Sequence, residues 1–417
     1  MDIARTSATT DTAASAVSTL IARARAAQAS IDRYSQEETD LLVSAAGWAI
    51  MEPARNQRLA ERAVADTGLG NVADKIAKNH RKTLGLLRDL KHARSVGVIS
   101  EHAETGIVEI ARPAGVVAAI TPSTNPGATP ANKIINALKG RNAIIVAPSP
   151  KGASTCELLL EFVHTEFDRI GAPRDLVQML PTPITKDATH ELMRQADLIV
   201  ATGSQANIRA AYSSGTPAFG VGAGNVAAII DRSADLDAAA ARIARSKTFD
   251  NATSCSSENS VVIDAVVYDE AIAALSRLGG VLVDASDKTR LQQALWPNGK
   301  LSGVLIAQSA PTIAETAGLH LAKAHSAAFL MVEEDGFGPR CPFSGEKLSP
   351  VLAVFRYPKG FQNALKMVGQ IFEVGGKGHS CGIASYSDAN IDALALMAPV
   401  SRIMVRQPNV HGNAGSF

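Results

Sequence analysis

Residues 115–122, G-V-V-A-A-I-T-P, decide the fold class, because they form a short continuous apolar run of the kind found in a buried strand. Similar runs recur downstream at regular spacing, and an amphipathic segment with helical periodicity follows each of them. We expect strands at residues 116–120, 143–147, 177–180 and 198–202, with helices around 130–138, 153–167, 189–195 and 205–212. Such alternation predicts a parallel, doubly wound α/β sheet with a nucleotide site at its strand ends.

The sequence before this sheet predicts a set of helices, and the sequence after it predicts a second domain. Residues 13–94 are rich in Ala, Arg and Leu with a period near 3.6, which indicates a set of helices. Residues 107–111 alternate apolar and polar side chains like a half-exposed strand. Beyond Gly224, further strands are expected at residues 226–230, 261–263, 301–307 and 351–355. We therefore predict a dinucleotide-binding domain at 1–224, a catalytic domain at 225–402 and a terminal strand within 403–417.

Composition limits the possible partners. The 417 residues carry 41 Lys and Arg against 40 Asp and Glu, so no overall charge favours nucleic acid or an anionic membrane. No apolar run reaches the roughly 18 residues of a membrane helix, and the start of the chain does not resemble a secretory signal. The four cysteines lie far apart without a C-x-x-C pair, so we expect neither a metal site nor disulfides. These features predict a soluble cytoplasmic protein with a small-molecule partner.

One cysteine has unusual neighbours. Cys255 lies in F-D-N-A-T-S-C-S-S-E-N-S, residues 249–260, among small polar side chains rather than the apolar residues that surround a structural thiol. This setting suits an accessible thiol that can ionise and react. An inert thiol is the alternative.

The nucleotide-binding signals are individually weak. The segment after the first strand, T-P-S-T-N-P-G-A-T-P, lacks the G-x-G-x-x-G fingerprint of a Rossmann domain. G-V-G-A-G-N at 220–225 is rich in glycine but precedes a strand, so a tight turn explains it equally well. T-G-S at 202–204 is better placed, because it ends a strand and enters a helix whose amide groups could face a phosphate.

Five segments together resemble the aldehyde dehydrogenase family, in particular its CoA-acylating branch. They are I-T-P-S-T-N-P at 120–126, A-T-G-S at 201–204, F-D-N-A-T-S-C-S-S-E at 249–258, G-E-K-L-S-P-V-L-A at 345–353 and G-K-G-H-S-C-G-I at 376–383. Their order and spacing fit along nearly the whole chain. The resemblance implies two Rossmann-like α/β domains plus an oligomerisation arm.

The resemblance implies that Cys255 is the nucleophile. Its thiolate would add to an aldehyde carbonyl, and the side-chain amide of Asn125 would stabilise the oxyanion together with the Cys255 N–H. Hydride transfer to a nicotinamide would then leave a thioester on the enzyme. For Asn125 the alternative is a turn-forming residue before Pro126.

The fate of the thioester separates acylating from hydrolytic members. Hydrolytic members carry a water-activating Glu in a stretch that corresponds to G-V-G-A-G-N, which has no carboxylate. Transfer to coenzyme A is therefore the expected second half-reaction. His379 matches a histidine of the acylating branch and could help to deprotonate CoA, although a structural histidine is an equal alternative. Glu258 is favoured as a structural residue over a general base, and Cys381 as a packed thiol.

The resemblance also predicts the cofactor residues. Glu346 matches the glutamate that holds the nicotinamide ribose. The remaining residues expected along the dinucleotide path are Thr121, Pro122, Ser123, Ser149, Gly203, Ser204, Gly222 and Gly224. Hydrolytic relatives commonly have K-P-S-E where this chain has A-P-S-P at 147–150, followed by Lys151. Without that Glu a 2′-phosphate could be tolerated near Lys151, so NADP is as plausible as NAD.

Substrate and assembly are less constrained. The stretches D-T-G-L-G-N-V-A-D-K (66–75), I-T-P-S-T-N-P and A-T-S-C-S-S-E-N-S (252–260) look closest to the sulfoacetaldehyde branch, with another short aldehyde such as acetaldehyde as the alternative. Arg402 and Arg406 are candidates for binding an anionic tail of the substrate, although exposed arginines are common.

The strands near 107–111 and 403–407 resemble the arm through which the family forms homodimers or homotetramers. Relatives continue beyond a stretch like the final G-N-A-G-S-F, which suggests a shortened chain. A hydrolytic enzyme and an inactive nucleotide-binding subunit remain alternatives.

Overall fold

The computed structural model describes residues 2–412, with side chains from residue 13 onward. The chain forms two compact units. Of the described residues, the first unit contains those up to Gly68 together with Lys75–Gly222, and the second contains Leu69–Asp74 and residues 223–412. The second unit thus includes a six-residue segment that the sequence analysis placed in the dinucleotide-binding domain. It also includes the described part of the predicted terminal segment 403–417, of which residues 413–417 lie outside the described residues.

Four helices begin the first unit, and capping residues mark the ends of two of them. They are α1 (Asp2–Ser30), α2 (Gln36–Met51), α3 (Pro53–Thr67) and α4 (Val72–Leu90), the last of which begins in the Leu69–Asp74 segment. Ser35 and Glu38 form a capping box at the start of α2. Helix α3 has proline at its first position and ends at Gly68, whose φ of 67° suits glycine.

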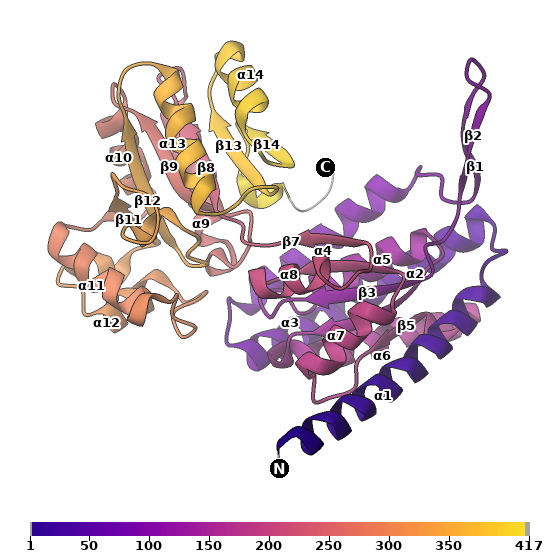
Figure 1. Ribbon diagram of the computed structural model, residues 1–417. Helices are drawn as coiled ribbons and strands as arrows, with labels where there is room; N and C mark the ends of the chain where they lie inside the picture. Colours follow the sequence, from indigo (N-terminus) through magenta and orange to yellow (C-terminus); the bar gives the residue numbers. More distant parts are fainter. Residues whose placement is uncertain (1, 413–417) are drawn as a thin grey trace. The chain divides into compact units, whose positions relative to one another are not determined.

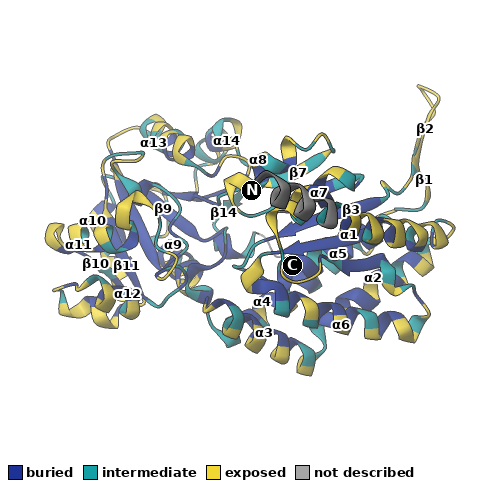
Figure 2. Ribbon diagram, turned by 60° about the horizontal axis from the view of Figure 1, so that its bottom comes forward, coloured by how far each residue is buried: buried dark blue, intermediate teal, exposed yellow. Residues whose placement is uncertain are grey.

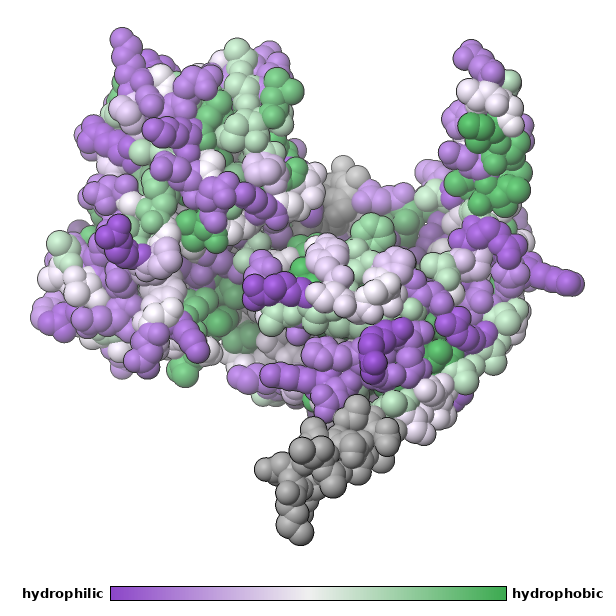
Figure 3. All heavy atoms as spheres, viewed as in Figure 1, coloured by the Kyte–Doolittle hydropathy of each residue, from purple (hydrophilic) through white to green (hydrophobic). Residues whose placement is uncertain are grey.

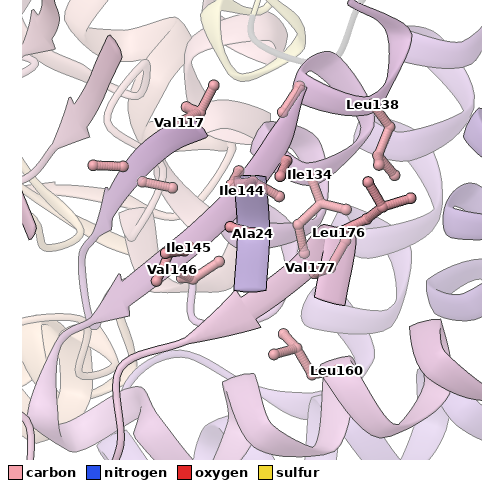
Figure 4. Packing of buried hydrophobic residues seen from close by; sticks show 14 of the residues in the cluster. Ala24, Val117, Ile134, Leu138, Ile144, Ile145, Val146, Leu160, Leu176 and Val177 are labelled. Carbon is pink, nitrogen blue, oxygen red and sulfur yellow. The ribbon is translucent and has the colours of Figure 1, made fainter. Parts of the chain in front are cut away.

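A five-stranded parallel sheet is the centre of the first unit. Its strands are β3 (Val116–Thr121), β4 (Ala143–Pro148), β5 (Val177–Met179), β6 (Leu198–Thr202) and β7 (Ala218–Val221), in the order β5-β4-β3-β6-β7. The connecting helices are α5 (Ala128–Lys139), α6 (Ala153–Ile170), α7 (Lys186–Gln195) and α8 (Gln205–Tyr212). Side chains from α1, α5 and α6 pack with the buried strand residues (Figure 4). The predicted doubly wound fold is therefore confirmed, and the strand order reverses between β3 and β6.

A two-stranded hairpin projects from this unit (Figure 1). Strands β1 (Gly97–His102) and β2 (Ile107–Ala111) pair antiparallel, and neither belongs to the five-stranded sheet. Figure 3 shows apolar surface on the hairpin, which comes from Val98, Ile99, Ile107, Val108 and Ile110. An isolated hairpin with exposed apolar side chains is marginally stable in water, which favours a covering partner.

The second unit is built around a seven-stranded parallel sheet. Its strands are β8 (Val226–Ile230), β9 (Glu258–Asp264), β10 (Gly280–Leu282), β11 (Phe329–Glu333), β12 (Val351–Tyr357), β13 (Ser380–Ala384) and β14 (Arg402–Val405), in the order β10-β11-β12-β9-β8-β13-β14. Its helices are α9 (Leu236–Thr248), α10 (Tyr268–Arg277), α11 (Ala285–Leu295), α12 (Ala310–Ala317), α13 (Phe361–Val374) and α14 (Asp388–Met397). Figure 2 shows the strands as buried ribbons.

Two expectations about strands need correction. The strand predicted at 301–307 is wrong, because the segment forms turns in which Val304 is exposed and Ala307 has a φ of 57°. The predicted terminal strand does form at Arg402–Val405, where it pairs with β13 as an edge strand of this sheet. In the described part of the chain, no helix has the length and apolar character of a membrane span.

Candidate active site

A cavity of about 360 Å³ lies in the first unit, at the carboxyl ends of β3, β4 and β6. This is the position at which doubly wound sheets bind nucleotides, where the strand order reverses. Six of the predicted cofactor residues line it: Thr121, Pro122, Ser123, Ser149, Gly203 and Ser204. The buried hydroxyl of Thr121 has no hydrogen-bond partner within the described structure, so the cavity wall offers a polar group for a ligand.

The entrance to α8 suits a phosphate. Ser204 caps this helix by accepting a hydrogen bond from the Asn207 N–H, and both residues line the cavity. The preceding Gly203 has a φ of 151°, which favours glycine. The first amide groups of the helix and its dipole therefore favour an anionic group at this end of the cavity.

The basic residues that line the cavity are not the one predicted from the sequence. Lys151 is exposed and is not among the lining residues, whereas Lys186 and His190, which the sequence analysis did not identify, do line the cavity. The lining residues include no carboxylate. Lys186 and His190 follow the third strand of the sheet, so a search for polar residues after every strand would have found them. Gly222 does not line the cavity either, and a Cβ there would lie 2.5 Å from the Gln205 side chain.

Asn125 lies just after β3 and is buried in the same unit. Its Oδ1 accepts a hydrogen bond of 2.9 Å from Nζ of Lys78, which is 1% exposed. An ammonium group can only donate, so this bond fixes the amide with Oδ1 toward Lys78 and directs Nδ2 away from it. Lys78 was not among the residues predicted from the sequence. The pattern that could have indicated it is the spacing of Lys75, Lys78 and Lys82, which places three lysines on one side of α4, and all three are buried.

Cys255 is the one partly exposed residue in a buried stretch of the second unit. It lies in the turn before β9, and residues 252–254 and 256–260 are all buried. The polar flanks that distinguished Cys255 in the sequence thus belong to a packed loop that leaves its thiol accessible. Cys156 is buried in the hydrophobic core of the first unit and Cys381 in a hydrophobic core of the second, as was expected of Cys381.

The backbone before Cys255 is strained. Asp250, Asn251 and Ala252 have φ angles of 51°, 49° and 57°, so three successive residues other than glycine adopt the left-handed conformation. Each such residue costs about 1–3 kcal/mol and persists only where its surroundings enforce it, and strain of this kind gathers at functional sites.

Gly224 and Glu346 lie beside Cys255. A Cβ on Gly224 would be 2.0 Å from the Cys255 carbonyl oxygen, so only glycine fits there. The Gly224 N–H donates a hydrogen bond of 2.8 Å to Oε1 of Glu346. Burial raises the pKa of the Glu346 carboxyl to about 7; the Gly224 hydrogen bond and His379 lower that pKa, and Cys255 raises it. Gly224, Cys255, Glu346 and His379 all precede strands, so they gather at the amino ends of the second sheet.

Glu258 has a structural environment. Its Oε1 accepts hydrogen bonds from the backbone N–H and the Nδ2 of Asn409, at 3.3 and 2.9 Å. Burial raises the pKa of the Glu258 carboxyl. The carboxylate therefore anchors the chain segment after β14, in agreement with the structural role that we favoured. His379 is buried, and its Nδ1 lies 3.1 Å from Oγ of Ser380.

The two arginines proposed for an anionic tail lie at opposite ends of the edge strand β14. Arg406 donates a hydrogen bond to the Ser385 carbonyl and stacks on the Tyr386 ring, at the carboxyl ends of the strands. Cys255 lies at the amino ends, so Arg406 is too far away to hold a substrate bound there. Arg402 begins β14 at the amino ends of the strands, and β14 lies three strand spacings or roughly 14 Å from β9.

Comparison with known proteins identifies the family. The sequence model of the aldehyde dehydrogenase family matches residues 3–282. The chain is 61% identical to the acylating sulfoacetaldehyde dehydrogenase of Cupriavidus necator, over 97% of this chain and 82% of the relative. It is 43% identical to the corresponding protein of Bilophila wadsworthia, over 94% and 85% of the two chains. The solved acetylating aldehyde dehydrogenase of Geobacillus thermoglucosidasius has a TM-score of 0.91 and 36% identity, with 97% of this chain and 88% of that chain covered.

These matches cover both units and confirm the resemblance inferred from the five motifs. The chain therefore belongs to the aldehyde dehydrogenase family, in the acylating branch that these relatives represent.

Proposed function

We propose that the protein oxidises sulfoacetaldehyde to the corresponding acyl-CoA, with NAD(P)+ as oxidant and CoA as acyl acceptor. The observation that carries this proposal is the 61% identity, over 97% of the chain, to a relative that is an acylating sulfoacetaldehyde dehydrogenase. The accessible thiol of Cys255 within a packed loop supports the chemistry. Acetaldehyde or another short aldehyde is the second candidate substrate.

Cys255 begins the reaction. Its thiolate adds to the aldehyde carbon, forming a C–S bond and an oxyanion. In the proposed mechanism, Nδ2 of Asn125 and the Cys255 N–H donate hydrogen bonds to that oxygen. The bond from Lys78 supports this role for Asn125, because it holds Oδ1 and keeps the donor side of the amide turned away.

Acylating aldehyde dehydrogenases use NAD(P) and CoA, and the cavity in the first unit suits a dinucleotide. A bound nicotinamide would supply the hydride acceptor there, and loss of hydride from the former aldehyde carbon would leave a thioester on Cys255. Thr121, Ser123, Ser149, Gly203 and Ser204 supply hydroxyl and amide groups along the cavity. We assign Pro122 to the wall, Glu346 to the nicotinamide ribose, and Gly222 and Gly224 to close backbone approach.

The absence of a lining carboxylate supports use of NADP. A carboxylate that binds a free 2′-hydroxyl would repel a 2′-phosphate, whereas Lys186 and His190 offer donors to it. We therefore propose that NADP is accepted, with Lys186 rather than Lys151 near the phosphate.

Transfer of the acyl group to CoA completes the cycle. The CoA thiolate attacks the thioester carbonyl, acyl-CoA leaves, and the Cys255 thiolate is restored. His379, which lies near Glu346, is proposed to accept the thiol proton. A hydrolytic outcome would need an activated water, and Glu258 is not suited to this because Asn409 holds its carboxylate.

We propose assembly as a homodimer or homotetramer through the β1–β2 hairpin. Its five exposed apolar side chains support this, because a second copy of the chain would cover them. No two cysteines of the described residues form a disulfide, which is compatible with the reducing cytoplasm that we propose as the location. If the hairpin is the interface, Ile110→Asp should lower the molar mass that light scattering measures, and an unchanged mass would contradict this assignment.

The experiment that tests the function measures NAD(P)H formation from sulfoacetaldehyde and from acetaldehyde, with and without CoA. Cys255→Ala is the test variant, and Cys381→Ala, which alters a buried thiol, is the matched control. CoA-dependent turnover that only Cys255→Ala abolishes is the expected result. Free acid formed without CoA would indicate the hydrolytic alternative. Dinucleotide binding without any turnover would indicate an inactive subunit.

A further inference from the structure

The Leu69–Asp74 segment holds the strained loop that carries Cys255. The Asn71 N–H donates a hydrogen bond of 3.0 Å to Oδ1 of Asp250, which is fully buried. The Asp250 N–H in turn donates a hydrogen bond of 2.7 Å to Oδ2 of Asp74. Asn71 and Asp74 are also bonded to each other, through Nδ2 to Oδ2 at 2.7 Å and through the Asp74 N–H to Oδ1 at 2.9 Å. This segment therefore holds both the carboxylate and the backbone N–H of Asp250.

Gly70 is shaped to receive Asp250. A Cβ at this position would lie 1.8 Å from Oδ1 of Asp250, closer than any two nonbonded atoms can approach. The close contact at Gly70 and the hydrogen bonds to Asn71 and Asp74 all come from one six-residue segment, which therefore fits closely around Asp250 in its left-handed conformation.

A second set of bonds joins the same segment to the loop through Ala307. The Ala307 carbonyl accepts hydrogen bonds from the Gly70 N–H at 3.2 Å and from Nδ2 of Asn251 at 2.9 Å. The Ala307 N–H donates to the carbonyl of Leu348 at 2.8 Å, two residues after Glu346. Ala307 and Leu348 also have positive φ angles, of 57° and 46°. Strained positions in three separate loops are thus connected by hydrogen bonds.

We propose that Leu69–Asp74 is a positioning clamp, which enforces the left-handed conformation of Asp250–Ala252 and thereby sets the place and exposure of the Cys255 thiol. Asp250, Asn71 and Asp74 are positioning residues in this assignment, because they act through the backbone of the loop. The inference rests on the proposed function for its catalytic consequence, but the effect on thiol reactivity is independent of CoA chemistry.

Two glycines provide a matched pair of variants. Gly68 and Gly70 have nearly the same φ, 67° and 72°, but nothing lies within 4 Å of a Cβ at Gly68. Gly68→Ala therefore introduces backbone strain alone, whereas Gly70→Ala introduces the same strain and also displaces Asp250. A displacement of about 1 Å at a reacting group can cost about 100-fold in rate.

The test measures the rate of Cys255 alkylation by iodoacetamide, followed by mass spectrometry of the peptide, and the burst of NAD(P)H from enzyme and aldehyde. We expect Gly70→Ala to lower both rates about tenfold or more and Gly68→Ala to change them less than about twofold. The cofactor KM should be unchanged in both variants. Equal effects of the two substitutions would overturn the clamp.

Substitutions of Asp250 keep the test informative if Gly70→Ala fails to fold. Asparagine tolerates the left-handed region and its amide oxygen can still accept from the Asn71 N–H, so Asp250→Asn should retain most of the alkylation rate. Asp74→Ala removes the acceptor of the Asp250 N–H and should lower that rate. Wild-type alkylation by Asp74→Ala would contradict the inference. An enzyme that lacks CoA-dependent turnover but shows these differences would refute the proposed function and leave the clamp standing.

Discussion

Replacement of Lys78 by methionine tests how the Asn125 amide is oriented. Lys78 is almost fully buried, and its ammonium donates to Oδ1 of Asn125 at 2.9 Å. Methionine has a similar volume without a donor, so the substitution leaves the packing nearly unchanged and removes the group that distinguishes the two ends of the amide. The amide can then rotate, which in the proposed mechanism would present an acceptor to the substrate oxyanion instead of a donor.

The magnitude follows from the strength of this bond. A hydrogen bond to a charged group contributes about 1.5–3 kcal/mol, which corresponds to roughly a 10- to 150-fold preference for one amide orientation. Complete loss of an oxyanion donor costs about 100- to 1,000-fold in kcat and sets an upper limit. We therefore expect Lys78→Met to lower kcat for aldehyde oxidation about 10- to 100-fold. Lys78→Arg, which keeps donors, should lose less.

A double-mutant cycle with Asn125→Ala is the assay. If Lys78 acts through Asn125, adding Lys78→Met to Asn125→Ala should change the NAD(P)H burst rate less than about twofold. The control is Lys139→Met, which removes another buried lysine, paired with Asp40 on the same unit. It should lower stability and leave kcat unchanged. Additive losses from Lys78→Met and Asn125→Ala would refute the reasoning, and a loss confined to sulfoacetaldehyde would indicate that the ammonium serves the substrate's charge instead.

Three further predictions concern the cofactor and the nucleophile. Gly224→Ala should abolish turnover by displacing the Cys255 carbonyl, whereas Gly303→Ala, where a Cβ meets nothing within 4 Å, should retain it; equal steady-state rates would contradict this. Because burial raises the pKa of Glu346 from 4.5 to about 7, the folded state holds its proton longer than the unfolded state, so stability should fall as pH rises between these values. Urea unfolding should show this slope weakened in Glu346→Gln, and an identical slope would exclude Glu346 as its source. Lys186→Glu should raise KM for NADP about tenfold or more with little change for NAD, and parallel changes for both would contradict a 2′-phosphate contact.

Much of the architecture could be read from periodicity. The strand at Leu198–Thr202 and the helix at Gln205–Tyr212 occur where predicted, because their apolar patterns reflect burial in one sheet and on one helix face. The strand predicted from the apolar run at 301–307 is wrong, because a short apolar run does not by itself indicate whether the segment pairs in a sheet.

The sequence by itself determined the family, the identity of the reactive cysteine as a hypothesis and the doubly wound fold, because these depend on motifs and periodicities within short stretches of chain. Only the tertiary structure revealed that Lys78 fixes the Asn125 amide, that Glu258 is held by Asn409 and that the Leu69–Asp74 segment grips Asp250. These contacts join residues 47, 151 and 179 positions apart. No local pattern encodes such pairs, since the free energy that favours them comes from burial and hydrogen bonding that exist only once the chain has folded.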